Sequence, residues 1–155
     1  MKLFYGFFLF TSFFLLFLSF SDVLNTSDFI FNKDDFMKVC FWENCFLSEI
    51  AKTKEDFFKG LMFRQKLDED KGMIFDFGKD GVYSFWMKNT LIPLDIIWIN
   101  NENKVVFIKK NAEPCSESSC PLTKPDKKAR YVLEINAGIS EKINLQLGDT
   151  AVFSY

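Results

Sequence analysis

The residues between Phe85 and Asp95 form the densest group of side chains that could bind a ligand. An aromatic residue, Trp86, is followed by Lys88 and Asn89, whose side chains donate hydrogen bonds. An aromatic face beside such donors is suited to a sugar or to a carboxylated small molecule. The same residues also fit a structural role, with Trp86 in the core and Asn89 holding a turn. The sequence leaves both interpretations open.

Three carboxylates, Asp95, Glu113 and Glu134, are candidates for acid and base catalysis on a glycan. Such catalysis needs two carboxylates across one bond, and the sequence does not give their separation. Arg64 can clamp a carboxylate of the protein or of a ligand, so Asp95 equally fits an ion pair with Arg64 or Lys88. The predicted ligand-binding residues are Arg64, Trp86, Lys88, Asn89, Asp95 and Glu134.

The chain contains no histidine, which narrows the chemistry that it can perform. Histidine is the side chain best suited to proton transfer near neutral pH. Ser-His-Asp and Cys-His catalysis are therefore excluded, as are the zinc sites of hydrolases that rely on imidazole ligands. We predict no cofactor and no metal, and we assign no catalytic residue.

The four cysteines occur as two local pairs, Cys40 with Cys45 and Cys115 with Cys120. In an outward-facing protein, an even number of cysteines indicates disulfides. Four cysteines permit three connectivities, and the two local loops are the simplest. A four-cysteine zinc site is the alternative, although structural zinc usually takes more closely spaced pairs.

An apolar run from Leu3 to Phe20 follows Lys2 and precedes a polar, acidic stretch. This order is typical of a secretory signal, and the run is also long enough to span a bilayer. Ser19 and Ser21 favour cleavage, while the lack of an Ala-x-Ala site leaves an uncleaved anchor open. In either case we predict an exported protein, secreted or membrane-anchored, with its domain outside the cytoplasm.

A length of 155 residues fits one domain behind a short leader. The net charge is −2, and without residues 1–21 the chain keeps 18 basic and 21 acidic residues. This balance argues against a nucleic-acid partner. We predict no nucleic-acid partner, and we predict contact with a membrane only through the N-terminal segment. The predicted organisation is a signal peptide or membrane anchor over 1–21, a polar spacer over 22–37 and one globular domain over 38–155.

Hydrophobic patterning predicts one short helix and several strands. Thr53-Lys54-Glu55-Asp56 has the form of a capping box, so a helix is expected from there to about Gln65. A first strand is expected within Cys45–Lys52, and Met73, Phe75 and Phe77 alternate as in a second. Further strands are expected at Val82–Met87, Leu94–Ile99, Val105–Lys109, Arg130–Ile135 and Ala151–Tyr155. The fold class is mainly β, a compact β-sandwich or barrel-like domain with one short helix.

Between Ile50 and Phe153 the sequence resembles the family DUF192, a domain of unknown function. The similarity is carried by segments in the same order: Gly60-Leu61-Met62-Phe63-Arg64, Gly72-Met73-Ile74-Phe75-Asp76-Phe77, Phe85 to Asp95, Asn111-Ala112-Glu113-Pro114-Cys115, Val132 to Gly138, and Gly148-Asp149. The resemblance implies a compact, mainly β domain that often follows an export signal. It implies no activity.

Three functions are compatible with these observations. The first, which we favour, is a non-catalytic module that binds a small molecule or glycan. The second is a structural or interaction domain of the cell envelope, which would expose an apolar patch. The third is a carboxylate-based glycan hydrolase, which would bring two carboxylates together across a cleft.

Overall fold

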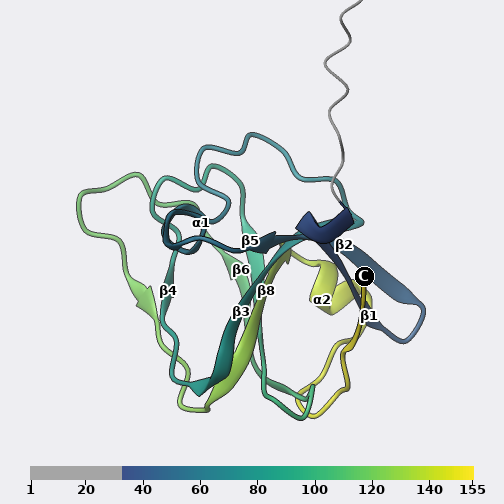
Figure 1. Cartoon of the computed structure of the whole chain (residues 1–155). Coiled ribbons are helices and arrows are strands. Elements are labelled where there is room, and N and C mark those ends of the chain that lie inside the picture. The colour runs from purple at the N-terminus through teal and green to yellow at the C-terminus, as the bar shows by residue number, and fades with distance from the viewer. Residues whose placement is uncertain (1–32) are drawn as a thin grey trace, which may run out of the picture. The chain divides into compact units, whose positions relative to one another are not determined.

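The computed structural model describes residues 33–155 (Figure 1). The predicted signal or anchor segment, residues 1–21, and most of the predicted spacer lie outside the described residues. Among the described residues, no helix is both long and apolar enough to cross a membrane.

The described residues form nine strands and three short helical segments, and the predicted mainly β fold is confirmed. The strands are β1 Phe36–Phe41, β2 Asn44–Ala51, β3 Lys71–Gly81, β4 Phe85–Trp86, β5 Leu94–Ile99, β6 Val105–Ala112, β7 Leu122–Thr123, β8 Ala129–Asn136 and β9 Val152–Ser154. The helical segments are a 3-10 turn at Lys33–Asp35, α1 at Lys54–Lys59 and α2 at Ile139–Lys142.

Seven strands form one sheet in the order β6-β5-β8-β3-β2-β1-β9, and β4 pairs with β7 in a second, small sheet. The pairing of β2 with β3 is parallel, and the other strand pairs are antiparallel. Backbone hydrogen bonds from Val105 to Asp149 and from Ala151 to Asn103 join the β6 edge to the segment before β9. The large sheet is therefore closed, as in a barrel.

The central strands of this sheet are buried on both faces. All six residues of β5 are buried, as its continuous apolar sequence predicts. One face packs in an inner core that contains Ile97 and Leu133. The opposite face packs in an outer core that contains Trp98 and Val132. Figure 1 shows α1 and β4 on one side of β3 and β8, with α2 on the other.

Helix α1 begins with the predicted capping box. The Thr53 hydroxyl accepts a hydrogen bond from the Asp56 amide, and the Asp56 carboxylate accepts one from the Thr53 amide. The helix ends at Lys59, because Gly60 adopts a positive φ of 48°. The chain then turns inward and buries Leu61 and Met62.

The structure corrects several sequence-based boundaries. The first strand is β1, which begins at Phe36 within the range interpreted as a spacer, and the strand expected first is β2. Helix α1 ends six residues before Gln65, and α2 was not predicted. Strand β3 continues to Gly81, and β4 at Phe85–Trp86 is shorter than the strand expected at Val82–Met87.

Removing the Thr53 hydroxyl tests whether its cap stabilises α1. Thr53→Ala should lower the free energy of unfolding by about 1 kcal/mol, measured by urea denaturation, because the Asp56 amide loses its acceptor. Thr53→Ser keeps the hydroxyl and should retain most of that stability. Equal losses in the two variants would contradict a role for the hydroxyl.

Candidate functional site

Glu134 lies in the middle of a strand that is covered on both faces. In β8 it stands opposite Met73 of β3 and Ile96 of β5. Both neighbours are buried and belong to the outer core, so Glu134 shares this face with apolar side chains. The strand therefore directs a carboxyl group into an apolar layer.

The carboxyl group of Glu134 is almost fully removed from water. The residue is 4% exposed. Its Oε2 is the one buried side-chain oxygen or nitrogen of residues 33–155 without a hydrogen-bond partner. Burial without a compensating partner disfavours the charged form and raises the pKa of Glu134 to about 8. At neutral pH this carboxyl is therefore mostly protonated.

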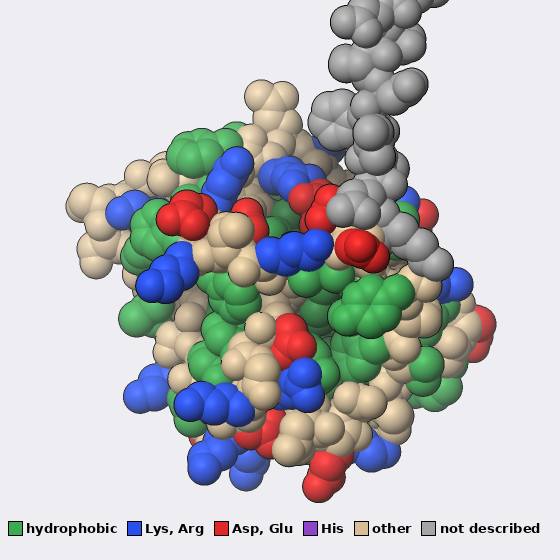
Figure 2. All heavy atoms as spheres, viewed as in Figure 1, with side chains coloured by type: hydrophobic (Ala, Val, Ile, Leu, Met, Phe, Trp, Pro, Cys, Tyr) green, Lys and Arg blue, Asp and Glu red, His purple; other side chains and the backbone are tan. Residues whose placement is uncertain are grey.

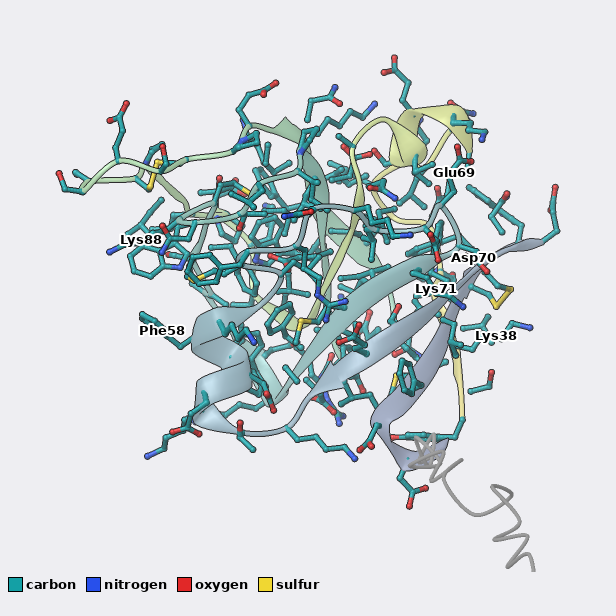
Figure 3. All side chains as sticks on the ribbon, turned by 90° about the horizontal axis from the view of Figure 1, so that it is seen from above. Lys38, Phe58, Glu69, Asp70, Lys71 and Lys88 are labelled. Carbon is teal, nitrogen blue, oxygen red and sulfur yellow. A yellow bond between two sulfur atoms is a disulfide. The ribbon has the colours of Figure 1, made fainter. Side chains whose placement is uncertain are left out.

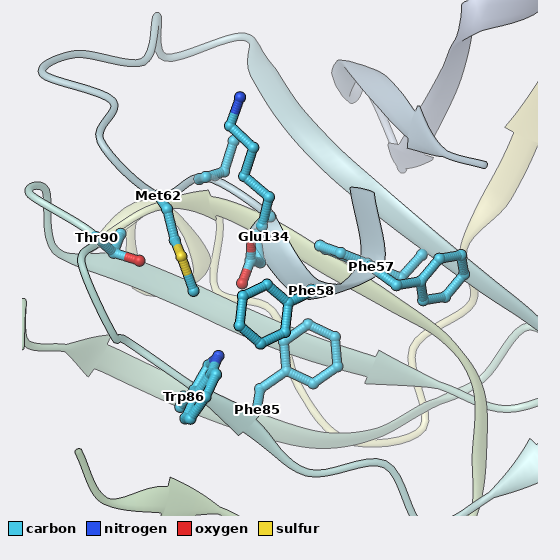
Figure 4. A pocket seen from close by; sticks show the side chains of 11 residues that line it. Phe57, Phe58, Met62, Phe85, Trp86, Thr90 and Glu134 are labelled. Atoms are coloured by element: carbon cyan, nitrogen blue, oxygen red, sulfur yellow. The ribbon is translucent and has the colours of Figure 1, made fainter. Parts of the chain in front are cut away.

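Glu134 contributes to the wall of a pocket rich in aromatic residues (Figure 4). The hollow measures about 260 Å³ including the part open to solvent, and its enclosed part has room for a water-sized group. Its lining residues are Phe57, Phe58, Lys59, Gly60, Leu61, Met62, Phe75, Phe85, Trp86, Thr90 and Glu134. Figure 4 shows the Glu134 carboxyl directed toward the space near Met62, Phe58 and Trp86.

Gly60 sits close to the carboxyl of Glu134. A Cβ at this position would lie 3.5 Å from Oε2 of Glu134 and 3.5 Å from the ring of Phe75. The positive φ of Gly60 also disfavours any other residue there. The backbone conformation therefore favours glycine at the end of α1, whereas a Cβ there would make only ordinary van der Waals contact with the carboxyl.

The pocket wall formed by Trp86 is held by the loop that follows β6. Trp86 pairs with Leu122 of β7. The amide of Asn89 donates to the carbonyl of Cys115, and the Cys115 amide donates to the Met87 carbonyl. Cys115 is bridged to Cys120. This disulfide therefore restrains the loop that supports the aromatic wall.

The two donors predicted beside Trp86 lie outside the pocket lining. Lys88 places its ammonium group 5.3 Å from the centre of the Trp86 ring. Asn89 adopts a positive φ of 54°, and its backbone carbonyl accepts from the Phe63 amide. In Figure 3, Lys88 and Phe58 lie on one side of the molecule, and Lys38, Glu69, Asp70 and Lys71 lie on the opposite side. Asn89 therefore holds a turn, through its backbone rather than its side chain.

Arg64 binds a protein carboxylate that the sequence interpretation did not identify. Its guanidinium donates two hydrogen bonds to Glu49, with Nη1–Oε1 at 2.6 Å. The structure thus corrects the proposed pairing of Asp95 with Arg64 or Lys88. Glu49 stands opposite Met73, which stands opposite Glu134, so Glu49 lies on the same face as Glu134 but two strands away, across β3.

Asp95 is fully buried and has three protein donors. Its Oδ1 accepts from the Asn111 amide at 2.9 Å. Its Oδ2 accepts from the amide and the hydroxyl of Ser140, at 2.8 and 2.7 Å. These bonds tie α2 and the end of β6 to β5. Asp95 therefore acts in the fold, and it does not line the pocket.

A larger hollow of about 580 Å³ lies beside Cys45, which is bridged to Cys40. Its charged residues include Glu69, which forms an exposed ion pair of 2.8 Å with Lys142. No side chain lining it carries a buried polar atom without a partner. We therefore place the candidate site at Glu134 and not in this larger hollow.

The sequence comparisons agree with this architecture. Residues 39–153 match the family DUF192, described as "Uncharacterized ACR". The chain belongs to DUF192. Four of the segments that carry the resemblance contribute residues to the pocket: Gly60–Arg64, Gly72–Phe77, Phe85–Asp95 and Val132–Gly138.

Two solved structures are similar to this DUF192 chain. A proposed transcription regulator from Sinorhizobium meliloti 1021 is 30% identical, with a TM-score of 0.68, covering 76% of this chain and 92% of that one. A protein of unknown function from Novosphingobium aromaticivorans DSM 12444 is 34% identical, with a TM-score of 0.67, covering 76% and 83%. The sequence matches none of the curated proteins.

The sequence interpretation named Trp86 and Glu134 but missed most of the residues around them. The missed wall residues include Phe57 and Phe58 from α1 and Phe75 from β3. One signal was available, because Glu134 interrupts an apolar run from Val132 to Ile135. A single carboxylate in a strand covered on both faces is a candidate for a perturbed pKa.

Substitution of Asp95 tests whether its hydrogen bonds stabilise the fold. Asp95→Asn should lower the free energy of unfolding by about 2–4 kcal/mol in urea denaturation, because an amide NH₂ would face a backbone donor. Asp126→Asn, at an exposed position, is the matched control and should change stability little. Similar effects of the two changes would contradict this role.

Glu134 should make stability depend on pH in the direction opposite to that of an ion-paired acid. Its pKa rises from 4.5 to about 8 in the folded state, so the folded state retains a proton that the unfolded state has lost. The free energy of unfolding should therefore fall by about 1.4 kcal/mol per pH unit between these values. Glu134→Gln removes this contribution, so its stability relative to the native chain should grow from pH 5 to pH 7.5. Parallel pH profiles in urea denaturation would contradict the raised pKa.

Proposed function

We propose that this DUF192 protein is a non-catalytic module that binds a small molecule in the pocket at Glu134. The observation that carries the proposal is the unpaired Oε2 of Glu134 in an aromatic-lined hollow. A buried polar atom without a partner costs free energy, and native structures rarely keep one without a reason. A ligand that hydrogen-bonds this oxygen would remove that cost.

The pocket favours a ligand with a small polar end and an apolar body. The enclosed part admits a water-sized group, while Phe58 and Trp86 form the outer wall with their rings 5.8 Å apart. Phe58 is 64% exposed, so its ring can gain contacts when a ligand covers it. A sugar, an alcohol or an amine each has a group able to bond Glu134.

Catalysis by two carboxylates receives no support from this geometry. Of Asp95, Glu113 and Glu134, only Glu134 lines the pocket. Asp95 is held by Asn111 and Ser140, and Glu113 is exposed on a loop. Glu49 shares the face of Glu134 but is bound by Arg64. A glycan hydrolase would need a second carboxylate facing the same ligand.

An interaction domain is the second candidate, because apolar side chains are exposed around the pocket. Phe63, Leu91 and Leu122 are each at least half exposed. The Phe63 amide bonds the Asn89 carbonyl, and Leu122 pairs with Trp86, which places both near the pocket wall. Hydrophobic side chains also lie between charged ones on the face drawn in Figure 2. A partner protein would cover these residues without needing Glu134.

We also propose that the domain functions outside the cytoplasm. The two disulfides, Cys40–Cys45 and Cys115–Cys120, indicate an oxidising environment. The apolar segment Leu3–Phe20 supports export. Fractionation of cells that express the full chain tests this, since a cytoplasmic, reduced protein would contradict it.

Ligand-observed NMR with a panel of monosaccharides, short alcohols and alkylamines tests the binding function. At least one class should bind the full-length protein. Phe58→Ala should weaken that binding by roughly tenfold, because the exposed ring contributes contact area to the ligand.

Phe63→Ala is the matched control for Phe58→Ala. Phe63 is 63% exposed, almost the same as Phe58, but it does not line the pocket. Its substitution should leave small-molecule binding unchanged. The absence of binding throughout the panel, or equal effects of the two changes, would contradict a ligand site in this pocket.

A further inference from the structure

We infer that the group bound by Glu134 is an organic ammonium, presented by a small aliphatic amine. This inference rests on the proposed binding function and specifies its ligand class. It follows from three features of the pocket: its aromatic walls, a carboxyl with no paired cation among residues 33–155, and the size of its enclosed part.

The aromatic walls suit a cation better than a neutral or anionic group. Five rings line the pocket, those of Phe57, Phe58, Phe75, Phe85 and Trp86. Several meet edge to face, including Phe75 with Phe85 at 5.0 Å and Phe58 with Trp86 at 5.8 Å. Ring faces carry partial negative charge and attract ammonium groups. The Trp86 ring already has the ammonium of Lys88 at 5.3 Å from its centre.

Among residues 33–155, no cationic side chain forms an ion pair with the carboxyl of Glu134. Burial alone raises the pKa of Glu134, with no contribution from a neighbouring charge. Lys59, from α1, lines the pocket but forms no ion pair with Glu134. On the neighbouring elements, Arg64 is bound to Glu49, Lys71 pairs with Asp70, and Arg130 pairs with Asp76.

An ammonium group matches both the size and the polarity of the enclosed space. A primary ammonium is about as large as a water molecule, and the enclosed part admits a group of that size. The lining contains four polar side chains, those of Lys59, Trp86, Thr90 and Glu134, and its two acceptors are the carboxyl of Glu134 and the hydroxyl of Thr90. Both can accept a hydrogen bond from N–H, and an ammonium has only donors to offer.

Binding of an ammonium must be coupled to release of a proton from Glu134. The free pocket holds a protonated carboxyl at neutral pH, whereas an ammonium pairs with the carboxylate. The carboxylic proton passes to solvent as the ammonium enters, so charge is conserved. Below pH 8 the affinity should therefore rise about tenfold per pH unit, and it should level off above pH 8.

The experiment compares n-butylammonium with n-butanol on the full-length chain by isothermal titration calorimetry. The two probes have the same apolar chain and differ in the polar end. Titrations in two buffers of different ionisation enthalpy count the protons released, and repeats at pH 6, 7 and 8 give the pH dependence. Glu134→Gln is the test variant, and Glu113→Gln, at an exposed position outside the pocket, is its control.

We expect n-butylammonium to bind at least tenfold more tightly than n-butanol at pH 8, with release of about one proton at pH 6–7. Glu134→Gln should abolish both the preference and the proton release, and Glu113→Gln should preserve them. Equal binding of the two probes without proton release would overturn the ammonium assignment and leave the binding function intact. If neither probe nor any member of the wider panel binds, both proposals are wrong.

Discussion

Two-sided burial of the central strands is the constraint on which the rest of this structure depends. Strands β3, β8 and β5 have the inner core on one face and the outer core on the other. The outer core exists only because α1, the chain after Gly60 and β4 cover that face. The side chains in the buried middle of these strands therefore have little access to bulk water, and their polar groups must be satisfied within the protein or by a ligand. The burial of Glu134 and its raised pKa follow from the way these elements cover the outer face of the sheet.

The two buried acids, Asp95 and Glu134, show that the effect of a buried carboxyl group on stability depends on its hydrogen-bond donors. Both lie on central strands, and both are almost inaccessible to water. Asp95 receives three donors, two of them from Ser140 at the start of α2, so its burial links separate elements. Glu134 has an oxygen with no donor. A carboxyl of the first kind stabilises the fold, whereas one of the second kind costs stability and is better explained by a function.

The sequence predicted the elements whose signals are local. Strand β5 was predicted with its observed bounds, because a continuous apolar run is visible without knowing its neighbours. The capping box at Thr53 was predicted for the same reason. The predicted end of α1 was wrong. Leu61 and Met62 continue the helical spacing of the sequence, but the chain turns at Gly60 and these two residues are buried after the helix has ended. The partners of Arg64 and Asp95 could not be predicted, since they lie 15 to 45 residues away along the chain.

The site is a further case of non-local assembly, because its parts come from α1, β3, β4 and β8. Glu134 could be named from the sequence as a carboxylate, but its state is set by side chains from the other elements. This dependence links stability to binding. Any change that opens the cover would hydrate the carboxyl and lower its pKa, and would thereby remove both the unpaired oxygen and the reason for a ligand to enter. The free energy lost by burying Glu134 without a partner is the same free energy that a hydrogen-bonding ligand can recover.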